Sequence, residues 1–83
     1  MIDEIEVDRL LELACGYWKP MHVYFAANPK YRKLQVVAWK KALCKAQVSY
    51  DEAIKAMVKY ATTPAGVFEP KVANIIETVK AMR

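Results

Sequence analysis

Few residues of this chain have the types and spacing that catalysis, metal binding or phosphate binding requires. The single histidine, His22, has no second histidine or cysteine at metal-ligand spacing, and a lone histidine between bulky residues is typical of a structural side chain. Gly16 and Gly66 lie too far apart in sequence to form a glycine-rich phosphate loop. No grouping of serine, cysteine and histidine indicates an activated nucleophile. We therefore expect no catalytic residue, no metal site, no cofactor and no enzymatic activity.

The two cysteines, Cys15 and Cys44, fall in apolar stretches with helical spacing. We interpret them as small buried side chains in a reducing compartment, although a disulfide between two helices stays open. Acidic residues follow Met1 and Ile2 where a signal peptide would carry basic ones, and no apolar run reaches the roughly 18 residues that span a bilayer. These features predict a cytoplasmic protein without a membrane segment.

Charge is distributed unevenly along the chain. Between Asp3 and Glu12 there are five acidic residues and one basic residue, whereas between Lys30 and Lys45 there are six basic residues and none acidic. A basic segment of this kind can bind nucleic acid or an acidic protein surface. It is equally typical of a solvated helix face that pairs loosely with an acidic neighbour.

The composition predicts an all-α fold in a single domain, residues 1–83. The chain has 83 residues, of which 55% are hydrophobic and only two are glycine, and this favours helices over a turn-rich sheet protein. Apolar residues recur three and four positions apart in four segments, which proline, glycine or serine separates. We therefore predict a small four-helix bundle with helices at about 4–19, 29–46, 50–61 and 70–82.

Local signals mark three of the predicted helix starts. Asp3 with Glu6, and Ser49 with Glu52, have the spacing of capping boxes, in which each side chain bonds the backbone amide of the other residue. Asn28 precedes a proline, so we predict that its side chain accepts the unpaired amides of the second helix.

The segment between the first two predicted helices is ambiguous. Lys19-Pro20 predicts the end of the first helix, because the residue before a proline is pushed away from helical angles. Residues 21–27 could be a short extended piece or one helical turn. Tyr24 and Phe25 in this segment must cover apolar surface, most simply the ends of the neighbouring helices.

The segment 68–76 closes the predicted bundle. We expect Phe68 to be a buried aromatic plug that packs near Ala73, in the manner of a hydrophobic staple. Pro70 suits the first turn of the fourth helix, where its missing amide costs nothing. Val72, Ile75 and later apolar residues form the buried stripe of that helix.

The second predicted helix carries the candidate partner-binding residues. Val36, Trp39 and Leu43 share its core stripe. The basic residues fall broadly on another side, where they are mixed with apolar residues, so that side could itself be a contact surface. The residues that we expect to combine on this outward side are Lys33, Val37, Lys40, Lys41 and Cys44.

Direct nucleic-acid binding by this basic helix is the alternative function. Aromatic residues interleave with basic ones at 30–33 and 39–41, and both stacking and phosphate contacts use such a pattern. Predicted helices two and three could also form a helix-turn-helix, although the acidic start of helix three disfavours it as a groove reader. Trp39 falls on the core stripe, which disfavours stacking on bases.

The ordered motifs of residues 7–79 resemble the helical N-terminal domain of the phage replicative-helicase loader and inhibitor family. That family's pattern is Trp-x-x-x-Leu, an acidic pair that caps a helix, an alanine-rich helix that ends in tyrosine, and then Phe-x-Pro-x-x-Ala-x-Ile. The first helix, which ends in Tyr17-Trp18, fits the family's leucine-rich opening. The segments that carry the resemblance are Trp39–Leu43, Ser49–Ile54, Met57–Tyr60 and Phe68–Ile75.

The resemblance implies a phage DNA-replication accessory protein without catalytic residues. Members of the family bind a hexameric replicative helicase and an origin-binding initiator, and they deliver or restrain the helicase in the bacterial host cell. Their helicase contact is attributed to a flexible C-terminal tail, whereas this sequence ends at Arg83, at the end of the fourth predicted helix. The contact would then lie on the bundle or in a tail outside this sequence. A structural subunit that only self-associates is a third possibility.

Overall fold

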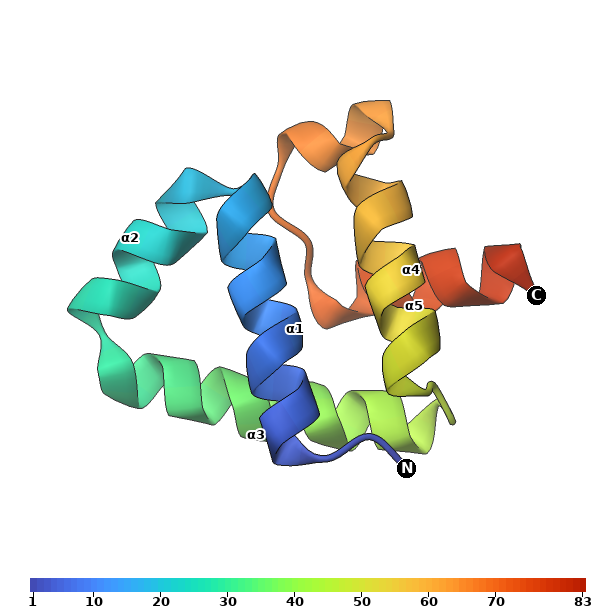
Figure 1. The fold of residues 1–83 in the computed structure, drawn as a ribbon, viewed down its shortest axis with the longest axis horizontal. Coiled ribbons are helices and arrows are strands. Elements are labelled where there is room, and N and C mark those ends of the chain that lie inside the picture. The colour runs from blue at the N-terminus through green and yellow to red at the C-terminus, as the bar shows by residue number, and fades with distance from the viewer.

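The computed structural model describes the backbone of residues 1–83 and every side chain except that of Ala65. The described chain is helical, as its composition predicts, but it forms five α-helices and a short 3₁₀ helix rather than four helices (Figure 1). The elements are α1 (Glu4–Tyr17), α2 (Lys19–Ala27), α3 (Pro29–Lys45), α4 (Tyr50–Ala61), η1 (Pro64–Val67) and α5 (Val72–Met82).

The additional helix is α2, in the segment that the sequence left ambiguous. The first helix ends at Tyr17 rather than at residue 19, because Trp18 is extended, with φ −121° and ψ 97°. Pro20 then lies in the first turn of α2, where it needs no amide partner and its fixed φ already suits a helix. The proline therefore begins a new helix as well as following the end of the first one.

Asn28 does not have its predicted capping role. Its side-chain Nδ2 donates a hydrogen bond to the Tyr24 carbonyl oxygen at 2.9 Å, so it closes the end of α2 instead of capping α3. The last carbonyls of a helix lack partners within the helix, and a side-chain amide can donate to them. Pro29 does occupy the first turn of α3, as predicted.

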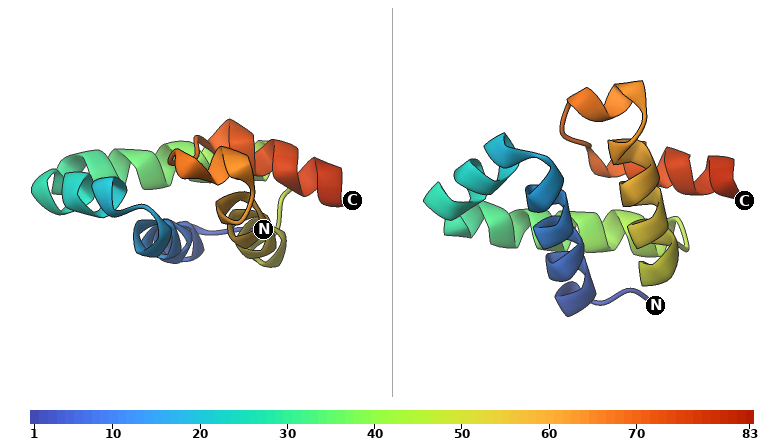
Figure 2. Two further views of the ribbon diagram at one scale, coloured as in Figure 1. Left: turned by 90° about the horizontal axis from the view of Figure 1, so that it is seen from above. Right: turned by 45° about the horizontal axis from the view of Figure 1, so that its top comes forward.

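The helices form two thin layers instead of a bundle of near-parallel helices. α1 and α4 pack side by side in one layer, and they cross steeply over α3 and α5 in the other (Figures 1 and 2). The Cα atoms extend over 36 × 29 × 16 Å. Single-residue links at Trp18 and Asn28 turn the chain sharply at both ends of α2, which prevents an up-and-down hairpin at these points.

One apolar core runs between the layers, and all five α-helices contribute to it. Most of the predicted stripe residues of α1, α3 and α5 are buried or half-buried, but Tyr17 of α1 and Ala73 and Met82 of α5 are exposed. In α4 the stripe shifts toward Ala56, while Val58 is exposed. The largest fully buried side chains are Leu10, Leu11, Leu43, Met57 and Ile75.

Trp18 links the two halves of the chain. Its indole Nε1 donates a hydrogen bond to the Gly66 carbonyl oxygen at 2.8 Å, and its ring lies against Tyr60 with a centroid distance of 5.9 Å. Gly66 packs so closely on the end of α4 that a Cβ atom there would lie 2.3 Å from the Tyr60 carbonyl oxygen and 2.8 Å from that of Ala61. Only glycine fits at this position without displacing backbone.

The predictions for residues 68–73 are wrong in part. Phe68 is 75% exposed and Ala73 is also exposed, so they form no buried staple. Pro70 is buried but precedes α5, which begins at Val72 instead of residue 70. The start is set by Asn74, whose Oδ1 accepts a hydrogen bond from the Lys71 amide at 2.8 Å. The segment that leads into α5 is thus exposed at Val67 and Phe68, which a local sequence pattern does not reveal.

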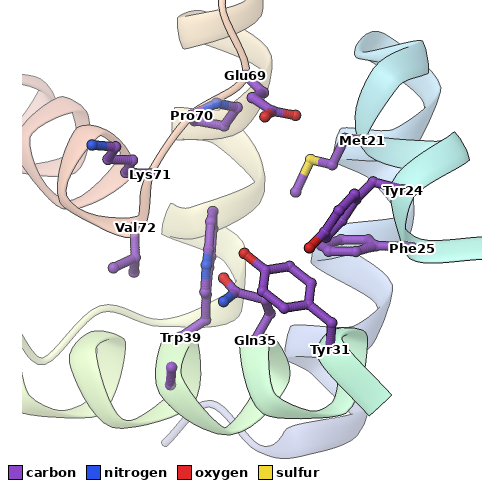
Figure 3. Close-up of a pocket in the computed structure, with 11 residues that line it drawn as sticks. Met21, Tyr24, Phe25, Tyr31, Gln35, Trp39, Glu69, Pro70, Lys71 and Val72 are labelled. Atoms are coloured by element: carbon purple, nitrogen blue, oxygen red, sulfur yellow. The ribbon is translucent and has the colours of Figure 1, made fainter. Parts of the chain in front are cut away.

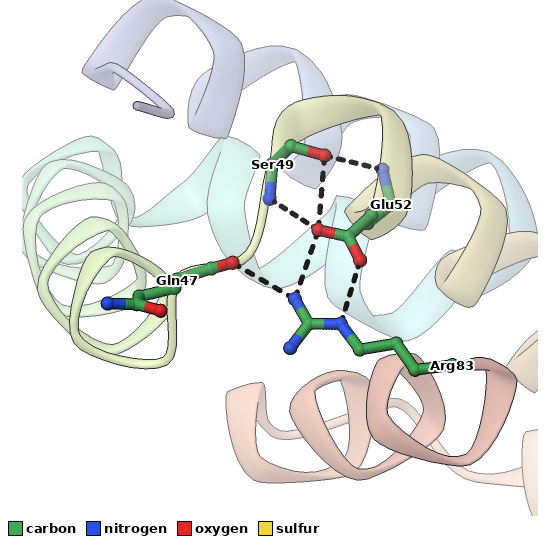
Figure 4. A network of polar contacts seen from close by, with 4 residues as sticks. All are labelled: Gln47, Ser49, Glu52 and Arg83. Atoms are coloured by element: carbon green, nitrogen blue, oxygen red, sulfur yellow. Dashed lines mark hydrogen bonds and ion pairs between the residues drawn. The ribbon is translucent and has the colours of Figure 1, made fainter.

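Both predicted capping boxes are formed, and the second belongs to a larger network (Figure 4). Glu52 accepts hydrogen bonds from the Ser49 amide and, in bidentate fashion, from the Arg83 guanidinium, at 2.9 Å from Nε and 3.1 Å from Nη2. The same guanidinium donates to the Gln47 carbonyl oxygen at 3.0 Å. Arg83 and the Ser49 amide together lower the pKa of Glu52 to about 2.

Two glycine substitutions should have opposite effects on stability. Gly66→Ala places a methyl group against backbone oxygens, so we expect it to lower the free energy of unfolding by about 1–3 kcal/mol. Gly16→Ala meets no atom within 4 Å and lies inside α1, so we expect it to raise that free energy by about 0.4–1 kcal/mol. Urea denaturation followed by circular dichroism at 222 nm checks both. Equal effects of the two substitutions would contradict the packing at Gly66.

The Glu52 network makes stability depend on pH. The pKa of Glu52 is lowered in the folded chain, from an ordinary 4.5 to about 2, so its contribution is complete above pH 4.5 and is lost as the pH falls toward 2. We expect the difference in urea midpoint between the wild type and Glu52→Gln to be largest at neutral pH and to shrink over this range. Glu77→Gln, which changes an exposed glutamate of α5 outside the network, is the control. A difference that stays constant from pH 7 to pH 2.5 would contradict this assignment.

Candidate interaction surface

The predicted partner-binding helix, α3, borders an open groove that α1 forms with it. We call this hollow the α1–α3 groove; its volume is about 820 Å³. The end of α2 closes one side of it. The residues that line it are Glu4, Ile5, Asp8 and Glu12 of α1, Phe25 and Ala26 of α2, and Pro29, Arg32, Lys33, Val36 and Val37 of α3.

The five candidate residues all lie on α3, but only two of them line the groove. Lys33 and Val37 line the groove and are exposed. Lys40 and Lys41 continue along the helix outside it. Cys44 differs from the expected outward side chain: it is half-buried beneath the N-terminal segment, and its Sγ lies 3.5 Å from the Ile2 carbonyl oxygen.

The walls of the groove carry opposite charges. Glu4, Asp8 and Glu12 lie on the α1 side, one helical turn apart, so their side chains share a face. Arg32 and Lys33 lie on the α3 side. The fold thus places the acidic segment, residues 3–12, next to the start of the basic segment, residues 30–45.

Arg32 bridges the two walls. Its Nη2 lies 3.0 Å from Asp8 Oδ1 and 3.4 Å from Glu12 Oε1, and its Nε donates a hydrogen bond to Asp8 Oδ1 at 3.1 Å. The interpretation that the basic segment pairs with the acidic first helix therefore holds for Arg32. Lys33 takes part in none of the ion pairs found among the described residues, so its charge faces solvent.

Ile5 is a surface residue that sequence reasoning missed. Its side chain is 66% exposed on the acidic wall, across the groove from Val37. The available signal was its position outside the α1 stripe of Val7, Leu10 and Leu11. An apolar residue off the buried stripe of an amphipathic helix has to face solvent or a partner.

The remaining reactive residues do not assemble into a site. Cys15 and Cys44 are free thiols, and burial raises the pKa of Cys15, which keeps it protonated and poorly nucleophilic. His22 is exposed on α2. Within the described part of the chain, no group of three or more histidine, cysteine or acidic side chains could hold a metal ion.

Comparisons with known proteins do not extend this description. No protein-family model, curated protein or solved structure matches the chain. No helix of the described residues is long and apolar enough to cross a membrane. The resemblance to helicase loaders and inhibitors therefore rests on the sequence motifs alone, and the function that it implies stays a prediction.

The bridge between the groove walls should be measurable as a coupling energy. In a double-mutant cycle of Asp8→Asn and Arg32→Met, we expect the two effects on the free energy of unfolding to be non-additive by about 0.2–1 kcal/mol, as for other partly exposed ion pairs. Urea denaturation at low salt provides the four values. Lys45→Met removes a cation from the far end of α3 and should be additive with Asp8→Asn. Additivity in the Arg32 cycle as well would show that the bridge contributes nothing.

Proposed function

We propose that this chain is a protein-interaction module, specifically a phage DNA-replication accessory protein that binds a hexameric replicative helicase as a loader or inhibitor. The observation that carries the proposal is the α1–α3 groove, in which exposed Ile5 lies on the acidic wall and exposed Val37 on the basic wall. In this proposal the protein acts in the cytoplasm of a bacterial host cell. It assigns the chain no catalytic activity and no cofactor.

The groove has the anatomy of a protein-binding surface. Interfaces combine an apolar centre, which supplies most of the binding energy, with a polar rim that orients the partner. Here Ile5 and Val37 supply exposed apolar surface, and Lys33 with the α1 carboxylates supplies the rim. A groove between two helices suits an amphipathic helix of the partner, whose apolar face would fill it.

A nucleic acid is a poorer occupant of the same groove. Its phosphates would meet Glu4, Asp8 and Glu12 as well as Lys33, and the Arg32 guanidinium between the walls is already paired with carboxylates. Trp39 is only 3% exposed, so it is not available to stack on bases. Both observations favour a protein partner on this face.

The alternative, nucleic-acid binding, retains one supporting observation. Lys41 and Lys45 are exposed and Lys40 is half-exposed on the last turns of α3, away from the acidic wall. Such a cluster could neutralise phosphates without reading bases. A chain that only self-associates through its exposed apolar residues is the third candidate.

The resemblance to the helicase loader and inhibitor family supplies the identity of the partner. Its motif residues are mainly structural in this fold, because Trp39 is buried and Ser49 with Glu52 caps α4. They support a shared arrangement of the core, and the proposed contact lies on other residues. An origin-binding initiator is the second partner that the resemblance implies.

Co-elution with a purified hexameric phage or host replicative helicase tests the proposal. We expect the chain to elute with the helicase on a sizing column and Val37→Asp to weaken this binding about tenfold, because a charge would enter the apolar centre of the contact. Val23→Asp changes another exposed valine, on α2 outside the groove, and should bind as the wild type does.

Salt dependence separates the alternatives. Helicase binding through the groove should change little between 50 and 200 mM salt, whereas phosphate binding should fall steeply. The combined change Lys40→Glu and Lys41→Glu should abolish binding in the nucleic-acid alternative and leave helicase co-elution intact in the proposed function. Absence of any helicase complex, together with salt-sensitive DNA binding, would overturn the proposed function. A stable homodimer without either ligand would favour self-association.

A further inference from the structure

A second hollow lies on the other side of α3, and we call it the aromatic pocket (Figure 3). It has a volume of about 450 Å³ and is bounded by α2, α3 and the segment that leads into α5. It shares only Phe25 with the α1–α3 groove. Its lining residues are Met21, Tyr24, Phe25, Tyr31, Gln35, Ala38, Trp39, Glu69, Pro70, Lys71 and Val72.

The pocket is defined mainly by aromatic rings that hold one another in place. Tyr24 and Tyr31 meet edge to face with ring centroids 4.8 Å apart, and Phe25 lies 5.9 Å from Tyr31. Trp39 and Phe25 are nearly buried, whereas Tyr24 and Tyr31 keep 50% and 38% of their surface exposed. The rings therefore form a wall with a buried back and an accessible front.

Three side chains of the pocket can accept hydrogen bonds from a ligand: the Glu69 carboxylate, the Tyr31 hydroxyl and the Gln35 amide oxygen. Figure 3 shows the Tyr31 hydroxyl and the Gln35 side-chain amide directed toward Trp39, with the Glu69 carboxylate at the opposite rim beside Met21. The described residues give Glu69 no ion-pair partner. Lys71 also borders the pocket, but its ammonium group points away from the rings (Figure 3).

A ligand that suits this arrangement is cationic and planar, with several donors. The electron-rich faces of tyrosine and tryptophan attract a cation placed over them. A guanidinium stacks on such faces and can donate at the same time to a carboxylate, a hydroxyl and an amide oxygen, which a compact ammonium group does less well. A volume of about 450 Å³ is at the small end of ligand sites, and it fits one long side chain.

We propose that the aromatic pocket binds an arginine side chain that a partner protein presents. The guanidinium packs against Tyr24 and Tyr31, pairs with the Glu69 carboxylate and donates to Gln35 or the Tyr31 hydroxyl. This site is separate from the α1–α3 groove and does not depend on the function proposed for that groove. The chain would thus hold two different partner segments on the two sides of α3.

Nuclear magnetic resonance titration with short peptides tests the site directly. The probes are N-acetylated, C-amidated Gly-Arg-Gly and its match Gly-citrulline-Gly, in which a neutral urea group of the same shape replaces the guanidinium. We expect the arginine peptide to shift the indole N–H signal of Trp39 and the backbone signals of Tyr31 and Glu69 in a saturable way. The citrulline peptide should bind at least threefold more weakly, because it lacks the charge that the rings and the carboxylate recognise.

Two variants locate the binding at these residues. Glu69→Gln and Tyr31→Leu should each weaken arginine-peptide binding about two- to fivefold, as expected for the loss of one exposed ion pair or cation–π contact. Glu77→Gln changes an exposed carboxylate that does not line the pocket and should bind as the wild type does. Glu69 is exposed, so its substitution leaves the core intact.

The outcomes decide the proposal. Preference for arginine over citrulline that Glu69→Gln reduces and Glu77→Gln preserves would support it. Equal shifts with both peptides, shifts confined to other parts of the chain, or equal binding by wild type and Glu69→Gln would overturn it. None of these results depends on helicase binding, so failure here leaves the groove proposal intact and failure there leaves this one intact.

Discussion

The hydrogen bond from the Trp18 indole to the Gly66 carbonyl constrains the rest of this small fold. The two residues are 48 positions apart: Trp18 links α1 to α2, and Gly66 lies in η1 after the end of α4. Trp18 can reach Gly66 only because α1 ends at Tyr17 and α2 turns away at once. Gly66 can lie there only because it lacks a Cβ atom, so that η1 folds directly onto the end of α4. The contact joins the end of α1 and the start of α2 to η1 at the end of α4, so it ties the first two helices to the last part of the chain.

Features that depend on neighbouring residues were predictable from the sequence. The capping boxes at Asp3 and Ser49, the helix over 50–61 and the apolar stripes of α1, α3 and α5 follow from spacing alone, since one helix imposes them. The errors arose where a residue had two local options and a tertiary contact decided. Pro20 suits either the end of one helix or the start of another, and Asn28 can accept from the helix after it or donate to the helix before it.

The surfaces were predictable only in part, because each is assembled from distant segments. The basic helix and its outward Lys33 and Val37 could be found from periodicity. The contribution of Ile5 depends on α1 crossing α3, and the Arg32 bridge depends on the register of that crossing. The aromatic pocket is formed by α2, α3 and Glu69 together, so the sequence of any one of these segments does not predict it.

Phe25 lies between the two hollows and borders both of them. Its ring forms part of the wall of the α1–α3 groove and part of the wall of the aromatic pocket. A ligand that turns this ring on one side changes the shape that is open to a ligand on the other. The two hollows are therefore thermodynamically linked wherever a bound segment moves Phe25, and by reciprocity each would alter the affinity of the other by the same factor. The Cα atoms span only 16 Å in the shortest direction, so one side chain is enough to reach both hollows and transmit such coupling.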